Sequence, residues 1–157
     1  MASRIFVHGL DSSSKGTKGT FFRKHYPDMI LPDFPGSLEK RMKILNDVLR
    51  GKNEIILVGS SFGGLMATLF TLDNEERVKR LVLLAPALNL VDPGTFNDRV
   101  IQVPTWIYHG TKDEVIPLSE IKHIGQGLFK DFTFVELDDD HNLHATFRAL
   151  PWNELLR

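Results

Sequence analysis

Short apolar runs alternate with amphipathic stretches along this chain, in the pattern that a parallel sheet covered by helices produces. Six runs rich in Ile, Leu, Val and Phe are apolar at successive positions, as expected of strands buried on both faces. These runs span residues 5–7, 29–31, 55–58, 81–84, 105–108 and 132–137. We therefore expect an α/β fold with a six-stranded, mostly parallel sheet.

Four further stretches predict helices between or after these runs. The first has Ser37 in position to cap its N-terminus and Gly51 where a C-terminal cap belongs. The third begins at Pro117, because proline suits the first turn of a helix. The predicted helices span residues 38–49, 62–72, 117–128 and 142–150.

Two connections are long. Residues 11–28, which include the sequence DSSSKGTKG, predict a loop that leads into a helix. Residues 85–103 carry Pro86, Pro93 and Gly94 and predict a loop with at most a short helix. Since the chain has 157 residues and no visible linker or repeat, we expect residues 1–157 to form a single domain.

Composition excludes several classes of protein. The formal net charge is −1, so neither nucleic acid nor an anionic membrane surface is favoured as a partner. The chain has no cysteine, which excludes disulfides, thiolate catalysis and zinc sites built from cysteine. The N-terminal residues lack the apolar segment of a secretory signal, and no apolar run has the length of a membrane span. We therefore expect a soluble, cytoplasmic enzyme or binding protein.

Residues 59–63 read Gly-Ser-Ser-Phe-Gly, a G-x-S-x-G sequence between a predicted strand and a predicted helix. In a nucleophile elbow the central serine, here Ser61, stands on a sharp strand-to-helix turn, and its neighbours Gly59 and Gly63 must be small. The N-terminus of the following helix favours an anionic intermediate there. The alternative is a glycine-rich turn used only for close packing or for phosphate binding, although no dinucleotide or Walker sequence accompanies it.

A serine nucleophile needs a base to take its proton and an acid to orient that base, and in this kind of site the chain order is serine, acid, histidine. His141 follows the last predicted strand, at the sheet edge where active-site groups gather, and is our candidate base. His144, one turn later, is its nearest rival. Asp113 follows the fifth run and is the candidate acid, with Glu114 and Asp92 as alternatives.

The other titratable residues near these positions receive structural interpretations. His109 ends the fifth run, and His123 lies within a predicted helix. Asp138, Asp139 and Asp140 precede the candidate base and indicate a solvated acidic turn.

A tetrahedral oxyanion needs two backbone N–H donors. One is expected from Phe62, the residue after the nucleophile, and the other from Leu10, in the loop after the first strand. Gly9 lets the backbone pass close to a substrate, and His8 is interpreted as the residue that orients this loop. The candidates to border an apolar acyl pocket are Leu10, Phe62, Leu88 and Leu90.

Four motifs stand in register along the chain, namely His8-Gly9, Gly-Ser-Ser-Phe-Gly-Gly, His109-Gly-x-x-Asp113 and Asp140-His141. Together they resemble the α/β-hydrolase superfamily over nearly the whole chain, and the segment His-Gly-Leu-Asp-Ser-Ser-Ser-Lys resembles small, cap-less, YqiA-like bacterial esterases. The resemblance implies a compact α/β-hydrolase fold with strand order 2-1-3-4-5-6 and helices on both faces. It implies no cap domain, because residues 85–103 are too few, and neither a cofactor nor a metal.

The function that this resemblance implies is hydrolysis of a small-molecule carboxylic ester or thioester. Ser61, His141 and Asp113 would form the triad, and the reaction would pass through an acyl-enzyme. Two alternatives stay open. The first is a non-catalytic binding module of the same fold. The second is another reaction on the same triad, such as carbon–carbon bond hydrolysis or cyanohydrin cleavage by a lyase.

Overall fold

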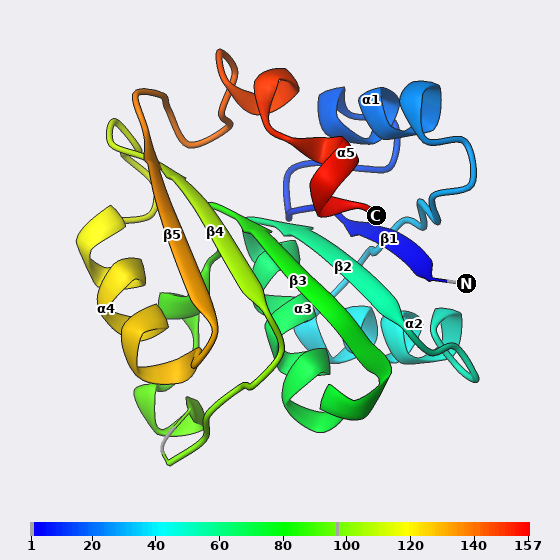
Figure 1. The fold of residues 1–157 in the computed structure, drawn as a ribbon, viewed down its shortest axis with the longest axis horizontal. Coiled ribbons are helices and arrows are strands. Elements are labelled where there is room, and N and C mark those ends of the chain that lie inside the picture. The colour runs from blue at the N-terminus through cyan, green and yellow to red at the C-terminus, as the bar shows by residue number, and fades with distance from the viewer. Residues whose placement is uncertain (1, 97) are drawn as a thin grey trace.

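The computed structural model describes residues 2–96 and 98–157. Its five-stranded sheet has the order β1-β2-β3-β4-β5, and every neighbouring pair is parallel. Because all strands run the same way, their carboxyl ends share one edge of the sheet, at the top of Figure 1. The strands are β1 (Ser3–Val7), β2 (Ile55–Ser60), β3 (Val78–Leu84), β4 (Thr105–Gly110) and β5 (Phe132–Leu137).

The prediction of a sixth strand at residues 29–31 is wrong. Ile30 forms a single parallel bridge with β1, in which its N–H donates to the Arg4 carbonyl (2.8 Å) and its carbonyl accepts from the Phe6 N–H (3.1 Å). Pro27 and Pro32 bracket the segment, and proline supplies no N–H to a ladder, so the pairing extends no further. The segment still lies beside β1, as the predicted order 2-1-3-4-5-6 requires. The five observed strands take the other five positions of that order.

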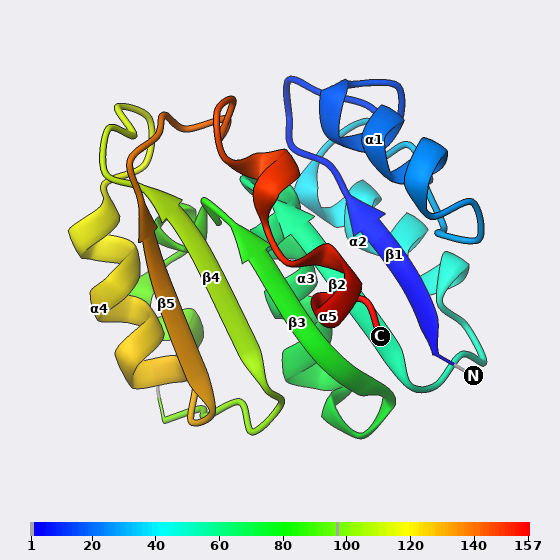
Figure 2. The same ribbon diagram turned by 45° about the horizontal axis from the view of Figure 1, so that its top comes forward.

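Helices cover both faces of the sheet, as Figure 2 shows. One face carries three helices, and the other carries two helices that lie near the chain ends. Each face has its own hydrophobic core. The first group is α2 (Leu38–Val48), α3 (Phe62–Asp73) and α4 (Leu118–Leu128), and the second is α1 (Thr17–His25) and the short α5 (Trp152–Leu155).

The helices over residues 38–49, 62–72 and 117–128 are confirmed within a residue or two at each end. Ser37 caps α2 as expected, since its side chain accepts the N–H of Lys40, and Gly51 follows with a φ of 75°. Residues 11–28 form a loop that leads into α1, also as expected.

The predicted helix over residues 142–150 is wrong. The Asp139 carboxylate accepts the N–H groups of Ala145 (3.0 Å) and Thr146 (2.8 Å), which a helix would have paired with backbone carbonyls. Leu143 adopts a left-handed φ of 54°, which also interrupts a helix. Only the 3₁₀ turn Phe147–Ala149 forms before Pro151, and α5 begins after that proline.

The described part of the connection after β3 is a loop, as predicted. Residues 85–96 and 98–103 contain two 3₁₀ turns, Leu88–Leu90 and Pro93–Phe96. A hollow of about 710 Å³ separates this loop from α4, with Leu88 and Ile124 among its walls. In the described residues, the helices are too short or too polar to cross a bilayer.

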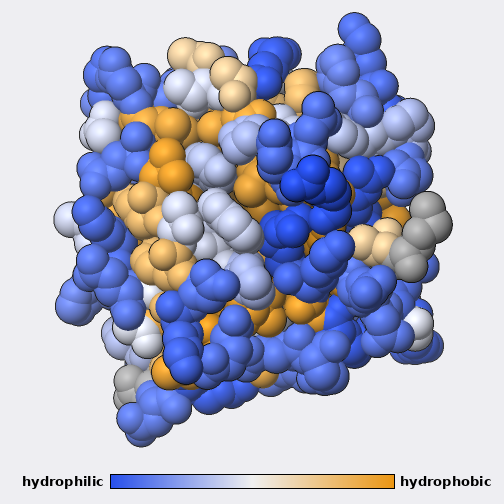
Figure 3. All heavy atoms as spheres, in the orientation of Figure 1, coloured by the Kyte–Doolittle hydropathy of each residue, from blue (hydrophilic) through white to orange (hydrophobic). Residues whose placement is uncertain are grey.

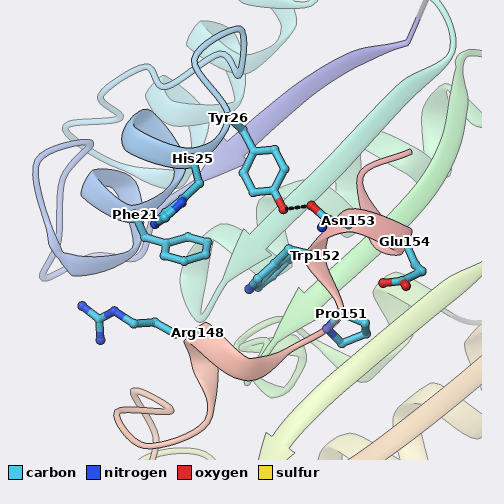
Figure 4. Close-up of a pocket in the computed structure, with 8 residues that line it drawn as sticks. All are labelled: Phe21, His25, Tyr26, Arg148, Pro151, Trp152, Asn153 and Glu154. Carbon is cyan, nitrogen blue, oxygen red and sulfur yellow. Dashed lines mark hydrogen bonds between the residues drawn. The ribbon is translucent and has the colours of Figure 1, made fainter.

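The face that carries α1 and α5 is only partly covered. Figures 1 and 2 show α1 beside β1 and α5 in front of β2 and β3, whereas neither helix covers β4 or β5. Trp106 and Val135 on those two strands are half-buried, and Figure 3 shows apolar side chains at this surface. A second hollow, of about 360 Å³, lies between α1 and the C-terminal segment, where Phe21, Tyr26 and Trp152 form part of its wall (Figure 4).

Candidate active site

Ser61 lies at the turn between β2 and α3 in a backbone conformation that side chains rarely adopt, with φ 55° and ψ −117°. Its N–H donates to the Leu84 carbonyl of β3 (2.9 Å). Its carbonyl accepts from the N–H groups of Gly64 (2.9 Å), Leu65 (3.3 Å) and Ala87 (2.9 Å). Hydrogen bonds from three segments of the chain therefore hold this strained residue in place.

Two glycines allow the turn to close. A Cβ atom at Gly63 would lie 2.0 Å from the Val7 carbonyl oxygen, and one at Gly59 would lie 2.5 Å from the Gly63 carbonyl oxygen. Because both distances are shorter than atoms tolerate, β1, β2 and α3 approach this closely only with glycine at both positions. The same approach brings the loop after β1 to the serine, where a Cβ on Gly9 would lie 3.4 Å from the Ser61 Cβ.

The structure brings Ser61, His141 and Asp113 together in one hydrogen-bonded series, although Ser61 and His141 are 80 residues apart. His141 Nε2 lies 3.1 Å from Ser61 Oγ, and His141 Nδ1 lies 2.7 Å from Asp113 Oδ2. Since a carboxylate only accepts, Nδ1 carries the proton, and Nε2 is free to accept from the hydroxyl. The Asp113 side chain is 0% exposed and that of His141 is 16% exposed, so the series opens to solvent at its serine end.

The Asp113 carboxylate is held by its own loop. Its Oδ1 accepts the N–H groups of Val115 and Ile116, both at 2.8 Å. Its Oδ2, which faces His141, also lies 3.2 Å from the Nε2 atom of the buried His109.

Asp139 organises the loop that carries His141, and this residue was missed by sequence reasoning. Its Oδ2 accepts from the hydroxyl of Thr146 (2.7 Å) as well as from the two N–H groups named above, and its Oδ1 accepts the N–H of Asp140 (2.8 Å). Asp139 is only 6% exposed, so the prediction of a solvated acidic turn is wrong for it. The prediction is right for Asp138 and Asp140, whose side chains are exposed.

Hydrogen bonding also determines the charge of these carboxylates. Burial raises the pKa of Asp139, but the hydrogen bonds from Thr146, Asp140 and Ala145 outweigh burial and hold that pKa below its ordinary value. The hydrogen bond to His144 lowers the pKa of Asp140 to about 2. Both carboxylates are therefore anionic at neutral pH.

Lys18 is a second residue that the sequence did not single out. Its Nζ donates to the Asn142 carbonyl (2.7 Å), which joins α1 to the loop of His141. Burial lowers the pKa of Lys18, while the nearby Asp140 and Asp139 act in the opposite direction.

The alternative bases and acids lie elsewhere. His144 pairs with Asp140 (2.6 Å), and its side chain is mostly exposed. His123 is exposed on α4, Glu114 is exposed beside the Asp113 loop, and Asp92 accepts the N–H of Gly94 in its own turn. Among the described residues, none of the hydrogen bonds of these side chains joins them to Ser61.

His8 ties two loops together. The Phe34 N–H donates to His8 Nε2 (3.0 Å), so the ring proton is on Nδ1, which donates to the Gly9 carbonyl (2.7 Å). This geometry suits a residue that orients the loop.

The Phe62 N–H is the first of α3, which leaves it without an intrahelical partner, and Leu10 directly follows Gly9. The oxyanion role of the Leu10 and Phe62 N–H groups stays a prediction.

Exposed apolar side chains lie on the loops that surround this edge of the sheet. Leu10, Leu90 and Val115 are 52%, 59% and 67% exposed and follow β1, β3 and β4. Phe62 is half-buried, whereas Leu88 belongs to the core at 1% exposure. The side chains of Ser61, His141 and Asp113 line neither of the two hollows described above. In the described residues, His, Asp and Glu side chains form no cluster of three that suits a metal ion.

Known proteins share this architecture. The family model for the alpha/beta hydrolase fold matches residues 9–103. A serine hydrolase homologue from Coxiella burnetii is similar in structure, with a TM-score of 0.79 and 20% identity over 99% of this chain and 83% of that one. No curated protein is significantly similar to the chain in sequence.

Two further solved structures are similar, at identities that show the fold alone. Est1E from Butyrivibrio proteoclasticus has a TM-score of 0.76 and 18% identity over 95% of this chain and 83% of its own. The monoacylglycerol lipase from Paleococcus ferrophilus has a TM-score of 0.73 and 18% identity over 98% of this chain and 90% of its own.

Proposed function

This chain belongs to the α/β-hydrolase fold family, and from that premise we propose that it is a serine hydrolase of small-molecule carboxylic esters or thioesters. One observation carries the proposal. Ser61 Oγ, the His141 ring and the buried Asp113 carboxylate are joined at 3.1 and 2.7 Å, and the serine stands on a strained turn at the open end of that series. A hydroxyl, a neutral imidazole and a buried carboxylate in this order are the parts that acyl transfer requires.

In the first step His141 Nε2 takes the hydroxyl proton of Ser61 while Oγ forms a bond to the carbonyl carbon of the substrate. The carbonyl electron pair moves to oxygen, and Asp113 stabilises the imidazolium that results. The N–H groups of Leu10 and Phe62 donate to the oxyanion, at the positive end of α3.

The carbonyl then forms again as the bond from its carbon to the alcohol oxygen or thiol sulfur breaks, and His141 returns its proton to this leaving group. An acyl group remains on Ser61. Water attacks this acyl-enzyme with His141 again as the base, which releases the carboxylic acid and restores the hydroxyl.

The surroundings of the serine favour an apolar acyl group. Leu10, Leu90 and Val115 present exposed apolar side chains on three of the loops at this edge of the sheet. In its described residues, the connection after β3 holds two 3₁₀ turns and no helix longer than these, so a substrate enters from an open surface. One of the similar structures is named as a lipase, which also favours ester substrates.

Hydrolysis of p-nitrophenyl esters of acetate, butyrate and octanoate, together with one small acyl thioester, tests the proposal. Ser61→Ala should lower kcat by about 10⁴-fold or more, since the nucleophile is lost. Ser60→Ala, a neighbouring change of the same size, should retain activity.

Two results would contradict this account. One is a Ser61→Ala protein that keeps its activity. The other is a folded wild-type protein that hydrolyses none of these substrates but binds one of them as tightly as Ser61→Ala does, which is the behaviour of a binding module. Turnover of a carbon–carbon or cyanohydrin substrate in place of any ester would assign another reaction to the same triad.

A further inference from the structure

The Asp113 carboxylate lies between two imidazole rings. His141 Nδ1 approaches its Oδ2 at 2.7 Å, and His109 Nε2 approaches the same oxygen at 3.2 Å. The same Nε2 atom lies 2.9 Å from the Ile116 carbonyl. Two acceptors therefore face one ring nitrogen of His109, a residue that the mechanism above does not use.

This arrangement fixes the protonation of His109. Since the Ile116 carbonyl only accepts, Nε2 carries the ring proton and donates it to that carbonyl, while Asp113 Oδ2 lies 3.2 Å from the same nitrogen. The side chain is 0% exposed. Burial lowers the pKa of His109, against the Ile116 carbonyl and Asp113, which raise it. The ring is therefore neutral at pH 7, and its other nitrogen, Nδ1, has no proton.

The unprotonated Nδ1 is buried and has no hydrogen-bond partner among residues 2–96 and 98–157. An unpaired buried acceptor destabilises a fold, because it has lost its hydrogen bonds to water without replacement. The imidazole of His109 stacks on the Phe134 ring, with 6.3 Å between the ring centroids and an interplanar angle of 17°. An apolar aromatic ring at position 109 would keep this stacking and would bury no unpaired acceptor. The one thing that the imidazole supplies and an apolar ring does not is the Nε2 proton.

Across the sheet register, His109 lies opposite Glu136, which pairs with Lys122 of α4 at 3.0 Å. The charges that act on the pKa of His109 are those of Asp113, which raises it, and of His141, which lowers it.

We propose that His109 is a positioning residue of the triad, whose polarised Nε2–H group lies close enough to Asp113 Oδ2 to hold this oxygen in line with His141 by electrostatic attraction and to weaken its pull on the imidazolium. This inference rests on the proposed function. Asp113 Oδ1 is held by two backbone N–H groups, whereas Oδ2, the oxygen that orients the base, has the His109 ring nitrogen 3.2 Å away.

Two substitutions separate the proton from the packing. His109→Phe keeps a ring against Phe134 but has no donor, whereas His109→Gln places an amide N–H near the position of Nε2. For His109→Phe we expect kcat to fall about ten-fold with KM unchanged, because the base is less well oriented. The acid limb of the kcat/KM profile should move to higher pH, since a carboxylate without the polarised N–H group beside it stabilises the imidazolium more strongly.

His109→Gln should recover most of kcat and return the acid limb toward its original pH. His123→Phe, the same change at an exposed histidine of α4, is the control and should leave both unchanged. If His109→Phe does not fold, as judged by urea unfolding, His109→Asn replaces it, because its shorter amide does not reach the Nε2 position.

A readout without turnover keeps this inference separate from the proposed function. The downfield proton resonance of the His141–Asp113 hydrogen bond should move in His109→Phe and stay in place in His109→Gln. If wild type hydrolyses nothing but the resonance behaves in this way, the proposed function fails and the positioning role stands. The inference is overturned if folded His109→Phe, or the His109→Asn that replaces it, keeps the wild-type kcat, the wild-type acid limb and the wild-type resonance. It is also overturned if His109→Gln is as impaired as His109→Phe.

Discussion

At the scale of single residues, the site depends on backbone positions that admit no side chain. Gly63→Ala should lower the free energy of unfolding by about 2 kcal/mol or more, because its Cβ would overlap the Val7 carbonyl. Gly127→Ala on α4 is the matched control. Nothing lies within 4 Å of its Cβ position, so it should stabilise the protein by about 0.5–1 kcal/mol. Urea denaturation measures both, and equal effects would contradict this account of the elbow.

Asp113, the proposed acid of the triad, allows a second test at this scale. Asp113→Asn keeps an oxygen for the Val115 and Ile116 N–H groups but no longer selects the tautomer of His141. We expect kcat to fall by about 10⁴-fold with the fold intact, measured by ester hydrolysis and circular dichroism. Asp92→Asn, at an exposed turn aspartate, should have no effect. An Asp113→Asn enzyme within ten-fold of wild type would remove Asp113 from the triad.

At the scale of elements, the loop between β5 and the 3₁₀ turn Phe147–Ala149 depends on Asp139. Asp139→Asn should lower kcat, because the loop positions His141, and should lower the free energy of unfolding at neutral pH by about 1–3 kcal/mol. Asp138→Asn, at a side chain that is 84% exposed, is the control.

The same substitution predicts a pH dependence. The folded-state pKa of Asp139 is below its unfolded value, so its carboxylate stabilises the fold above about pH 4, and this contribution is lost as pH falls through the folded-state pKa. Thermal unfolding from neutral to acid pH should therefore vary less in Asp139→Asn than in wild type. Parallel curves for the two proteins would show that Asp139 does not supply this acid sensitivity.

Local sequence patterns predicted most elements but not those set by long-range contacts. The spacing of apolar residues and the cap at Ser37 were enough for α2, and buried runs were enough for the five strands. The helix over 142–150 failed because a carboxylate from outside the helical pattern captured its N–H groups. In the site, motif order pointed to Ser61, Asp113 and His141. Nothing in three successive aspartates shows that the middle one turns inward.

At the scale of the whole molecule, the sheet holds together groups that are distant along the chain. The C-terminal segment covers one face of the sheet and buries Trp152, which is 3% exposed. The centroid of the Trp152 ring lies 5.0 Å from that of the Phe22 ring. Trp152→Ala should lower the free energy of unfolding by about 3–5 kcal/mol. Trp106→Ala, on the partly uncovered surface of β4, should have a smaller effect. Urea unfolding followed by circular dichroism compares the two, and a larger loss for Trp106→Ala would contradict this packing.

The central claim is that one serine among those of this chain is a nucleophile activated by a distant histidine. Reaction with a fluorophosphonate, followed by mass-spectrometric mapping of the adduct, tests it most directly. The account predicts one adduct per chain on Ser61, absent from Ser61→Ala and formed much more slowly in His141→Gln. An adduct on any other residue, or a folded wild-type protein that does not react, would contradict it.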